Sequence, residues 1–200
     1  KIRTHEENEL AHYASKTSDI EFMYPWGWGE LEGIANRGTF DLTSHERESG
    51  KDLTYFDPES NEKINPVVIE PAGGLTRTLF AILCSSYDED TVNDTTRTLF
   101  RFNFDIAPIQ IAILPLSKKD NLINTSKKIK TKLQRSFRTE IDITQSIGKR
   151  YRRQDEIGTP YCITVDFETM DDDSVTIRNR DTMNQERVEI NKLHDYFENI

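Results

Sequence analysis

Residues 65 to 84 have the sequence Asn-Pro-Val-Val-Ile-Glu-Pro-Ala-Gly-Gly-Leu-Thr-Arg-Thr-Leu-Phe-Ala-Ile-Leu-Cys, and this stretch predicts a strand followed directly by a helix. The β-branched run at residues 67–69 is too short for a helix and lies between Pro66 and Pro71, which is typical of a buried strand. The predicted strand ends on a carboxylate, Glu70, at the point where the chain must turn.

The turn and the helix follow from the glycines and the apolar spacing. Gly73 and Gly74 free the backbone for a tight turn or for close approach to a ligand. Apolar residues then recur at helical spacing between Leu75 and Leu83. Arg77 lies in the first turn of this predicted helix, where a cation opposes the helix dipole. An anion bound beside Arg77 would explain its position.

The pattern Glu-Pro-x-x-Gly-x-x-Arg running into an apolar helix resembles motif 3 of the class II aminoacyl-tRNA synthetases. The chain as a whole resembles the C-terminal portion of a dimeric-type glycyl-tRNA synthetase. Three further blocks carry the resemblance, in the family's order: Trp26 to Arg37, Ala107 to Leu116, and Ser146 to Tyr161. Together with motif 3 they cover nearly all of the chain.

This resemblance implies an α/β protein with two parts. Residues 1–98 would form the C-terminal part of an α+β catalytic domain built on an antiparallel sheet. Residues 99–200 would form a three-layer α/β anticodon-binding domain with a mixed sheet. The acidic, polar stretch from Ser85 to Thr96 is expected to end the motif 3 helix and to mark the boundary.

Sequence periodicity predicts the individual elements. In the first part we expect a helix over Glu6–Ala14, strands over Asp19–Tyr24 and Trp26–Asn36, and a partly helical connection over Asp41–Ser49 that leads into an irregular hairpin. In the second part we expect a buried strand over Ile106–Leu114, followed by a helix with Leu122, Ile129, Leu133 and Phe137 inward. A strand over Ile141–Ile143 and a basic helix over Ser146–Glu156 should come next. The chain should end with strands over Tyr161–Phe167 and Val175–Arg180 and a closing helix over Asn191–Ile200. Strict alternation in residues 26–36 places Trp28, Glu30 and Glu32 on one side.

The resemblance implies a glycine–tRNA ligase, which joins glycine to ATP as glycyl-adenylate and then transfers the glycyl group to tRNA(Gly). Catalysis would consist of positioning and of neutralising phosphate charge, with Mg²⁺ expected alongside ATP. Arg77 and Glu70 match the catalytic positions. The implied ATP-binding residues are Glu30, Leu31, Gly74, Leu75, Thr76 and Arg77, and the implied glycine-binding residues are Glu70, Pro71, Ala72, Gly73 and Gly74.

Each of these residues also has an ordinary structural interpretation. Glu30 could be an exposed glutamate on a close-packed glycine-lined sheet. Arg77 could pair with Glu70 alone, and Glu70 could do no more than cap the turn that follows it. His5, Glu9 and His12 would share one face of the predicted first helix, but a solvated face is expected there and no structural metal.

The chain departs from the family's pattern in two ways. Ala72 stands where the family usually has serine, and Gly73 stands where a bulkier residue is common. Motifs 1 and 2, which the family needs at its dimer interface and at the α-phosphate, do not occur before motif 3. We therefore expect the isolated 200-residue chain to lack aminoacylation activity. The alternative function is that of a non-enzymatic tRNA-binding or accessory paralogue.

Charge is distributed unevenly along the chain. The net charge is −9, yet residues 101–157 contain 13 Lys plus Arg against 6 Asp plus Glu, a local +7 that leaves −16 elsewhere. A polyanion would bind in this central stretch. The resemblance implies anticodon contacts in the predicted basic helix, from Lys149, Arg150, Tyr151, Arg152, Arg153 and Gln154. A solvated basic helix is the alternative.

Composition limits the remaining possibilities. An apolar content of 35% suffices for ordinary cores, and no window approaches the roughly eighteen apolar residues of a spanning helix. The polar first residues do not resemble a signal peptide, so we expect a cytoplasmic protein that has no membrane partner. The resemblance implies a homodimer at full length. The two cysteines, Cys84 and Cys162, are expected to be buried thiols.

Overall fold

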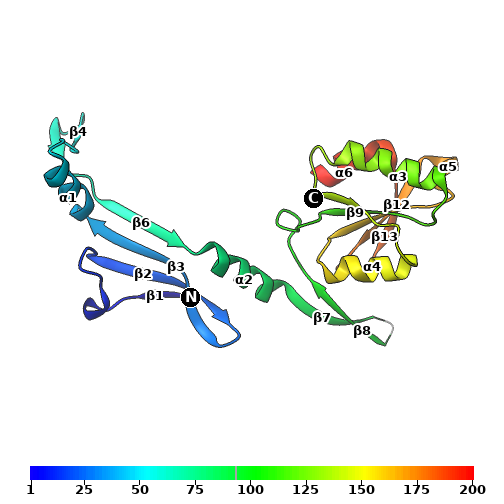
Figure 1. Cartoon of the computed structure of the whole chain (residues 1–200), viewed down its shortest axis with the longest axis horizontal. Helices are drawn as coiled ribbons and strands as arrows, with labels where there is room; N and C mark the ends of the chain where they lie inside the picture. Colours follow the sequence, from blue (N-terminus) through cyan, green and yellow to red (C-terminus); the bar gives the residue numbers. More distant parts are fainter. Residues whose placement is uncertain (93) are drawn as a thin grey trace. The chain divides into compact units, whose positions relative to one another are not determined.

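The structure is a computed structural model that describes residues 1–92 and 94–200. The chain forms two compact units, Lys1–Ser85 (unit 1) and Ser86–Ile200 (unit 2). The division falls before the boundary expected after residue 98. The reason is that the strands over Tyr87–Val92 and Thr95–Phe100 pair as a hairpin whose Arg97 is buried among residues of unit 2. Each unit is described separately below (Figure 1).

Unit 1 is built on a four-stranded antiparallel sheet with the order β1-β2-β3-β6. The strands are β1 (Ile2–Thr4), β2 (Lys16–Tyr24), β3 (Gly27–Gly38) and β6 (Val68–Gly73). Helix α1 (Phe40–Ser49) and the hairpin of β4 (Tyr55–Asp57) and β5 (Glu62–Ile64) lie between β3 and β6 in the chain, and α2 (Leu75–Ser86) follows β6. The strand and the helix expected over residues 67–83 are therefore present, but the strand continues to Gly73, so the prediction that it ends on Glu70 is wrong and only Gly74 separates it from the helix.

Strand β6 differs from its prediction in one respect. It is an edge strand that pairs only with β3, and most of its residues are exposed, so the prediction of a buried strand is wrong. The edge position explains why Pro71 can lie inside the strand, since proline lacks the N–H that a second neighbour would require. The first turns of α2 are also exposed, with Leu75 at 84% and Leu79 at 56%.

Unit 2 begins with a hairpin of β7 (Tyr87–Val92) and β8 (Thr95–Phe100) and continues into a five-stranded mixed sheet with the order β10-β9-β11-β12-β13. Strands β10 (Thr139–Ile141), β9 (Ile111–Pro115) and β11 (Tyr161–Val165) are parallel, whereas β12 (Ser174–Asn179) and β13 (Gln185–Glu189) are antiparallel. The helices are α3 (Asp120–Leu133), α4 (Ile147–Glu156), α5 (Thr169–Asp172) and α6 (Leu193–Glu198), with a 3₁₀ turn η2 (Ile190–Lys192) before α6.

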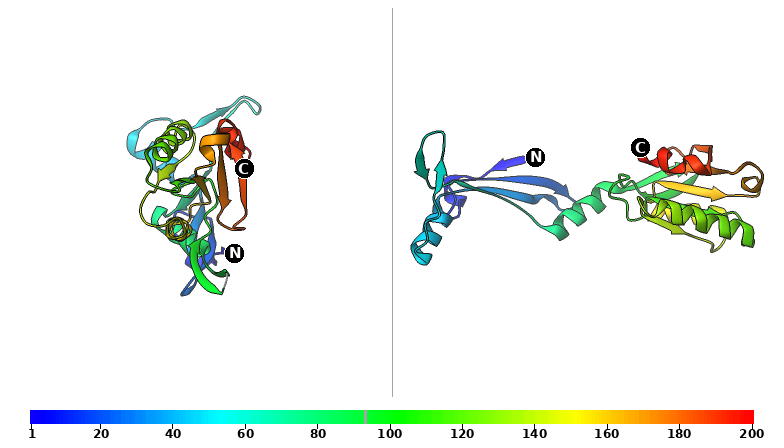
Figure 2. Two further views of the ribbon diagram at one scale, coloured as in Figure 1. Left: turned by 90° about the vertical axis from the view of Figure 1, so that its right-hand side faces the viewer. Right: turned by 90° about the horizontal axis from the view of Figure 1, so that it is seen from above.

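Two layers of helix cover the sheet of unit 2 (Figures 1 and 2). On one face, Leu122, Ile129 and Leu133 of α3 and Leu193 and Phe197 of α6 pack with β-branched residues of β9, β11 and β12. On the other face, residues of α4 cover Ala112, Leu114 and Cys162. All five residues of β9 are buried, as its apolar run predicts for a strand covered on both faces. The predicted α/β class, antiparallel in the first part and mixed in the second, is confirmed.

Several predicted elements are wrong. The helix over Glu6–Ala14 is reduced to the 3₁₀ turn η1 (Glu7–Glu9), so His5, Glu9 and His12 do not share a helical face. Residues expected to end α2 form the β7–β8 hairpin, and β1 and β13 were not predicted. The short helix α5, which lies between the two strands expected over Tyr161–Phe167 and Val175–Arg180, was not predicted either. Among the described residues, no helix is both long and apolar enough to cross a membrane.

A buried ionic cluster joins the hairpin to the sheet of unit 2. Asp155 of α4 is 2% exposed and accepts two hydrogen bonds from Arg178 of β12, at 2.8 and 2.9 Å. Arg97 of β8 donates to the same carboxylate at 3.0 Å, to the carbonyl oxygen of Arg180 at 2.9 Å, and to Asp90 of β7. One carboxylate therefore serves two buried guanidinium groups from different elements.

Replacing Asp155 with Asn should destabilise unit 2 by about 3–5 kcal/mol, because Arg97 and Arg178 would lose their shared buried counter-charge. Urea unfolding followed by hydrogen exchange of β9 and β11 amides would measure this. The matched control is Glu189→Gln, which breaks an exposed ion pair with Lys192 and should cost less than about 1 kcal/mol. Both tryptophans lie in unit 1, so neither substitution should change the urea transition followed by tryptophan fluorescence. Equal effects of Asp155→Asn and Glu189→Gln on the stability of unit 2 would contradict the proposed role of the cluster.

Below neutral pH, the stability of unit 2 should fall only in acid. Hydrogen bonds from Arg97 and Arg187 lower the pKa of Asp90 and Asp172, respectively, below the value of a free aspartate. A lowered folded-state pKa stabilises the native state above the unfolded pKa of about 3.9, and that contribution is lost as the pH falls through the folded pKa. Denaturation midpoints should be flat from about pH 7 to 5 and fall below about pH 4. A midpoint that stays constant down to pH 2.5 would contradict this.

Candidate functional site

A β-bulge in β3 decides which side chains share a face in unit 1. Ile20 of β2 pairs with Glu32, but the next residue, Glu21, pairs with Glu30, so Leu31 is an extra residue on β3. The strict alternation expected for this strand is therefore wrong. Glu30 lies on the same face as Gly33, and a Cβ atom on Gly33 would approach the Glu30 carboxylate to 3.4 Å.

Strand β6 adds Glu70 to this face. Glu70 pairs with Ala35 of β3, and Ala72 pairs with Gly33. These residues and Glu30 line one cavity of about 270 Å³. The rest of its wall is His5, Glu9, Ala11, Tyr13, Thr17 and Asp19. Glu70 and Glu30, which are 40 positions apart in the chain, therefore open onto a common space.

The cavity is acidic and its floor is built from small residues. Glu9, Asp19, Glu30 and Glu70 contribute four carboxylates. Asp19 is bonded to His5 at 2.7 Å, and Glu9 and Glu70 form ion pairs with Arg3 and Arg37. Gly33, Ala35 and Ala72 lie between these acids and leave the space open. Such a cavity suits a small cationic group, because each carboxylate can accept a hydrogen bond from an ammonium.

Arg37 fixes the carboxylate of Glu70. Its Nη1 donates to Glu70 at 2.7 Å, while Nε and Nη2 donate to Asp41 at 2.5 and 2.7 Å. The guanidinium also lies 4.0 Å from the ring centre of Tyr13. The hydrogen bonds to Asp41 and Glu70 raise the pKa of Arg37, so its charge is permanent. Sequence reasoning missed Arg37 and Asp41, although both lie beside the Trp26–Arg37 block.

Arg77 contacts Glu30, one of the residues that line the cavity. In the first turn of α2 it donates from Nη1 to the backbone carbonyl of Glu30 at 2.7 Å and lies 4.0 Å from the Glu30 carboxylate. It forms no bond to Glu70 among the described contacts, so the simple Arg77–Glu70 pair considered above is absent. The guanidinium is half exposed and keeps donors for another acceptor.

The other residues assigned to this region are open to solvent. Pro71, Ala72, Gly73, Gly74, Leu75 and Thr76 are exposed, and Leu31 is half-buried at the bulge. The structure thus brings Glu30, Glu70 and Ala72 together in one cavity and places Arg77 at its margin. It leaves the Gly74–Thr76 segment beside Arg77 at the start of α2.

Helix α4 is less available to RNA than its composition suggests. Arg150 and Gln154 are 3% and 1% exposed. Arg150 donates to the carbonyl oxygens of Pro115 and Asp142 at 2.7 and 3.0 Å, and burial lowers its pKa. Gln154 accepts a bond from Thr159 at 2.6 Å. Neither side chain can reach a nucleotide without leaving the core.

Some of the other α4 residues expected to contact the anticodon already form hydrogen bonds within the protein. Tyr151 shares a hydrogen bond with Thr164, and Arg153 binds the Asp142 carboxylate. Arg152 donates to the carbonyl oxygen of Thr96 at 2.9 Å and stays half-exposed. Lys149 is exposed and has no ion-pair partner among the described residues. Lys149 and Arg152 are therefore the members of this set best placed to meet a ligand.

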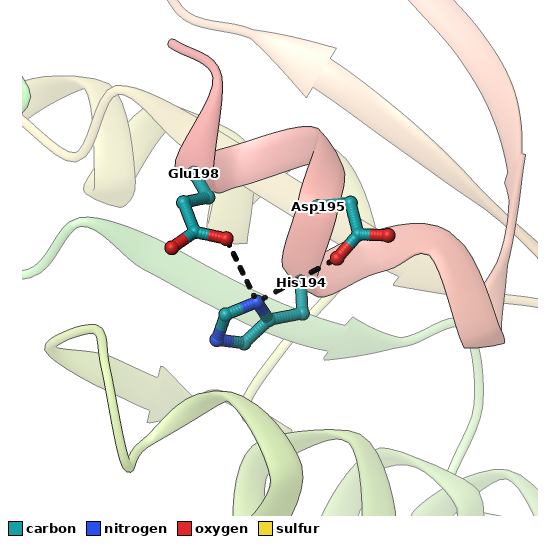
Figure 3. A group of neighbouring side chains, drawn as sticks. All are labelled: His194, Asp195 and Glu198. Atoms are coloured by element: carbon teal, nitrogen blue, oxygen red, sulfur yellow. Dashed lines mark ion pairs between the residues drawn. The ribbon is translucent and has the colours of Figure 1, made fainter.

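One cluster elsewhere has the composition of a metal site. His194 Nδ1 lies 3.6 Å from Glu198 and 3.9 Å from Asp195, on one turn of α6 (Figure 3). Both carboxylates are largely exposed, and the other imidazole nitrogen is bonded to Ser136 at 3.0 Å. These three side chains are ordinary neighbours on a solvated helix. Cys84 and Cys162 are free thiols; Cys162 is buried as expected, whereas Cys84 is half-buried. Burial raises the pKa of Cys162 to about 12.

Two comparisons relate the chain to known proteins. Residues 110–200 match the anticodon binding domain family. The whole chain is 55% identical to the glycine–tRNA ligase of Ruminiclostridium cellulolyticum, over 43% of that protein. The chain is homologous to glycine–tRNA ligases. The corresponding enzymes of Clostridium kluyveri and Clostridium beijerinckii are 52% and 51% identical over 98% and 99% of this chain, and 42% of each is covered. The chain thus spans less than half the length of the curated glycine–tRNA ligases it matches.

Substitution of Arg150 should separate a structural role from a binding role. Arg150→Met is expected to lower the stability of unit 2 by about 2–4 kcal/mol, because buried carbonyl oxygens lose their donors. The adjacent Lys149→Met should change it by less than about 0.5 kcal/mol. Urea unfolding monitored through unit 2 amides measures both; a neutral Arg150→Met would contradict the structural role.

Proposed function

We propose that the chain forms part of a glycine–tRNA ligase, supplying one side of the site that makes glycyl-adenylate together with the domain that binds the anticodon of tRNA(Gly). The observation that carries the proposal is the acidic cavity shared by Glu30 and Glu70, with Arg77 at its margin. Homology over the whole chain supports it. The proposal extends to a homodimer of the full-length ligase, to Mg²⁺ with ATP, and to a cytoplasmic location.

The ammonium group of glycine fits the acidic cavity. Glu70 is the carboxylate proposed to receive it, and the Arg37 hydrogen bond holds that carboxylate in place. The small residues Gly33, Ala35 and Ala72 keep the space between the acids open for the substrate. Because glycine has no side chain to bind, selection depends on excluding larger amino acids.

The triphosphate of ATP is proposed to lie at the margin of the cavity, against Arg77. In the first step a glycine carboxylate oxygen attacks the α-phosphorus and pyrophosphate leaves. In the second, a hydroxyl of the terminal ribose of tRNA attacks the glycyl carbon and AMP leaves. Arg77 contributes a permanent, planar charge to the phosphates, while Glu30 and Leu31 and the Gly74–Thr76 segment border the nucleotide. No side chain becomes covalently modified.

Ala72 is the observation that favours the second candidate, an accessory tRNA-binding paralogue. Ala72 lines the cavity, so the missing hydroxyl falls where a substrate would lie. Against this, an accessory protein has no need to keep Glu30, Glu70 and Arg77 around one space. The ligase is therefore the function that the geometry supports best.

The test is a chimera in which this chain replaces the region it matches in the R. cellulolyticum glycine–tRNA ligase. The chimera should exchange pyrophosphate into ATP in the presence of glycine. Glu70→Gln in the chimera should raise the KM for glycine by roughly 10- to 100-fold, since one charge-assisted hydrogen bond is weakened, and leave the KM for ATP within about threefold.

Glu32→Gln is the matched control, because it removes a carboxylate from the neighbouring position on the opposite face of β3. It should alter neither constant. A folded chimera that forms no adenylate, while the parent ligase does, would sink the proposal. The isolated chain is expected to be inactive in the same assay.

A further inference from the structure

Most arginines of the chain already have carboxylate partners. Arg97, Arg101, Arg153, Arg178, Arg180 and Arg187 of unit 2 all form ion pairs. Their charge is neutralised within the fold and is not available to a polyanion. The cations that matter for binding are therefore those left without a partner.

Such cations gather on the outer face of α3. Residues 118–138 contain eight Lys or Arg and one Asp, in a chain whose net charge is −9. Lys127, Lys128, Lys132 and Arg135 line one shallow hollow of about 480 Å³ with Thr131, and all five residues are exposed. Within the described part of the chain, Lys127, Lys128 and Arg135 form no ion pair.

The architecture of α3 does not explain these charges. Cations stabilise a helix dipole only in the last turn, which accounts for Lys130 and Lys132 but not for Lys127 and Lys128. Lys132 is also held by the carbonyl oxygen of Asn191 at 3.1 Å. Like charges at this spacing repel one another, so the hollow is less stable when empty than when an anion fills it.

From this we infer that the basic face of α3, formed by Lys127, Lys128, Lys132 and Arg135, binds the phosphate backbone of RNA. The inference rests on the proposed function, since it names a tRNA contact that the α4 residues were expected to provide. It assigns α3 a positioning role: lysines and exposed arginines on phosphates give affinity without sequence preference. Base recognition is left to other parts of unit 2.

The surroundings favour RNA over a lipid surface. Three of the four large apolar residues of α3, Leu122, Ile129 and Leu133, are buried in the core, and the fourth, Ile123, is half-buried, so the helix presents no continuous apolar face to a bilayer. On the side of Lys132, Asp172, Asp173 and Glu189 line the neighbouring hollow and limit the patch. A phosphate chain would therefore follow the Lys127–Arg135 side of the helix.

The experiment measures binding of an RNA stem–loop carrying the anticodon of tRNA(Gly), by fluorescence anisotropy, at several salt concentrations. The test variant of the full 200-residue chain is Lys127→Gln, Lys128→Gln and Arg135→Gln. The charge-matched control is Lys16→Gln, Arg47→Gln and Lys51→Gln, three exposed cations of unit 1. Hydrogen exchange of β9 and β11 amides verifies that unit 2 stays folded.

The test variant should bind on the order of tenfold more weakly than the control at 0.1 M salt, and the slope of log Kd against log salt should fall by about 2–3. A stem–loop with a changed anticodon should lose affinity by the same factor. Equal Kd values and slopes for test and control variants would overturn the inference. Binding to phosphatidylserine vesicles with none to RNA would overturn it as well.

The same measurements separate this inference from the proposed function. If the unmodified chain binds both anticodons equally but depends on α3, the phosphate contact stands and the claim of tRNA(Gly) selectivity fails. If it prefers the glycine anticodon but the α3 variant is unimpaired, the ligase proposal survives and the α3 contact is wrong. If it binds no RNA at low salt, both are wrong.

Discussion

The single extra residue at Leu31 is the constraint on which the candidate catalytic face depends. Side chains alternate strictly along a strand, so without the bulge Glu30 and Gly33 would lie on opposite faces of the sheet. With it, Glu30 joins Asp19 and Glu70 around one cavity, and its backbone carbonyl is presented to Arg77. A local irregularity in one strand thus connects a carboxylate on the sheet with a guanidinium on the following helix.

A hydrogen bond from Arg37 holds the Glu70 carboxylate in this arrangement. A carboxylate on an edge strand would ordinarily sample several rotamers, but Glu70 is held by a guanidinium that is itself fixed by two bonds to Asp41. Asp41 lies in the first turn of α1, where a negative charge is favoured by the helix dipole. The position of α1 after β3 therefore affects the orientation of a side chain on β6. This chain of contacts fixes the Glu70 carboxylate in the orientation that the proposed glycine site requires.

The elements that could be predicted from the sequence are those marked by apolar periodicity or by motif spacing. The strand, glycine turn and helix around Glu70 were recognisable, as were α3 and the buried run of β9, because their apolar patterns are long or strongly periodic. The bulge was not, since a single inserted residue leaves no compositional signal. The β7–β8 hairpin was missed because its strands are polar. Their stability comes from Arg97 and Asp155, which are 58 positions apart, a tertiary contact that no local pattern reports.

The same reasoning explains why the basic helix was misjudged. A charge count from composition treats every arginine as free to bind a ligand. In the structure, Arg150 donates its hydrogen bonds to backbone carbonyl oxygens and Arg153 donates to the Asp142 carboxylate. Gly158, with φ of +83°, lets the chain after α4 turn tightly against Phe102, where a Cβ atom would lie 2.3 Å from the ring. The arginines of α4 and the turn that follows the helix are therefore both packed within unit 2. Helix α3 differs: its apolar residues pack against the sheet, whereas Lys127, Lys128 and Arg135 are exposed and form no ion pair within the described residues. A surface whose charges do nothing for the folded chain is the better place to look for an RNA contact than one whose charges hold it together.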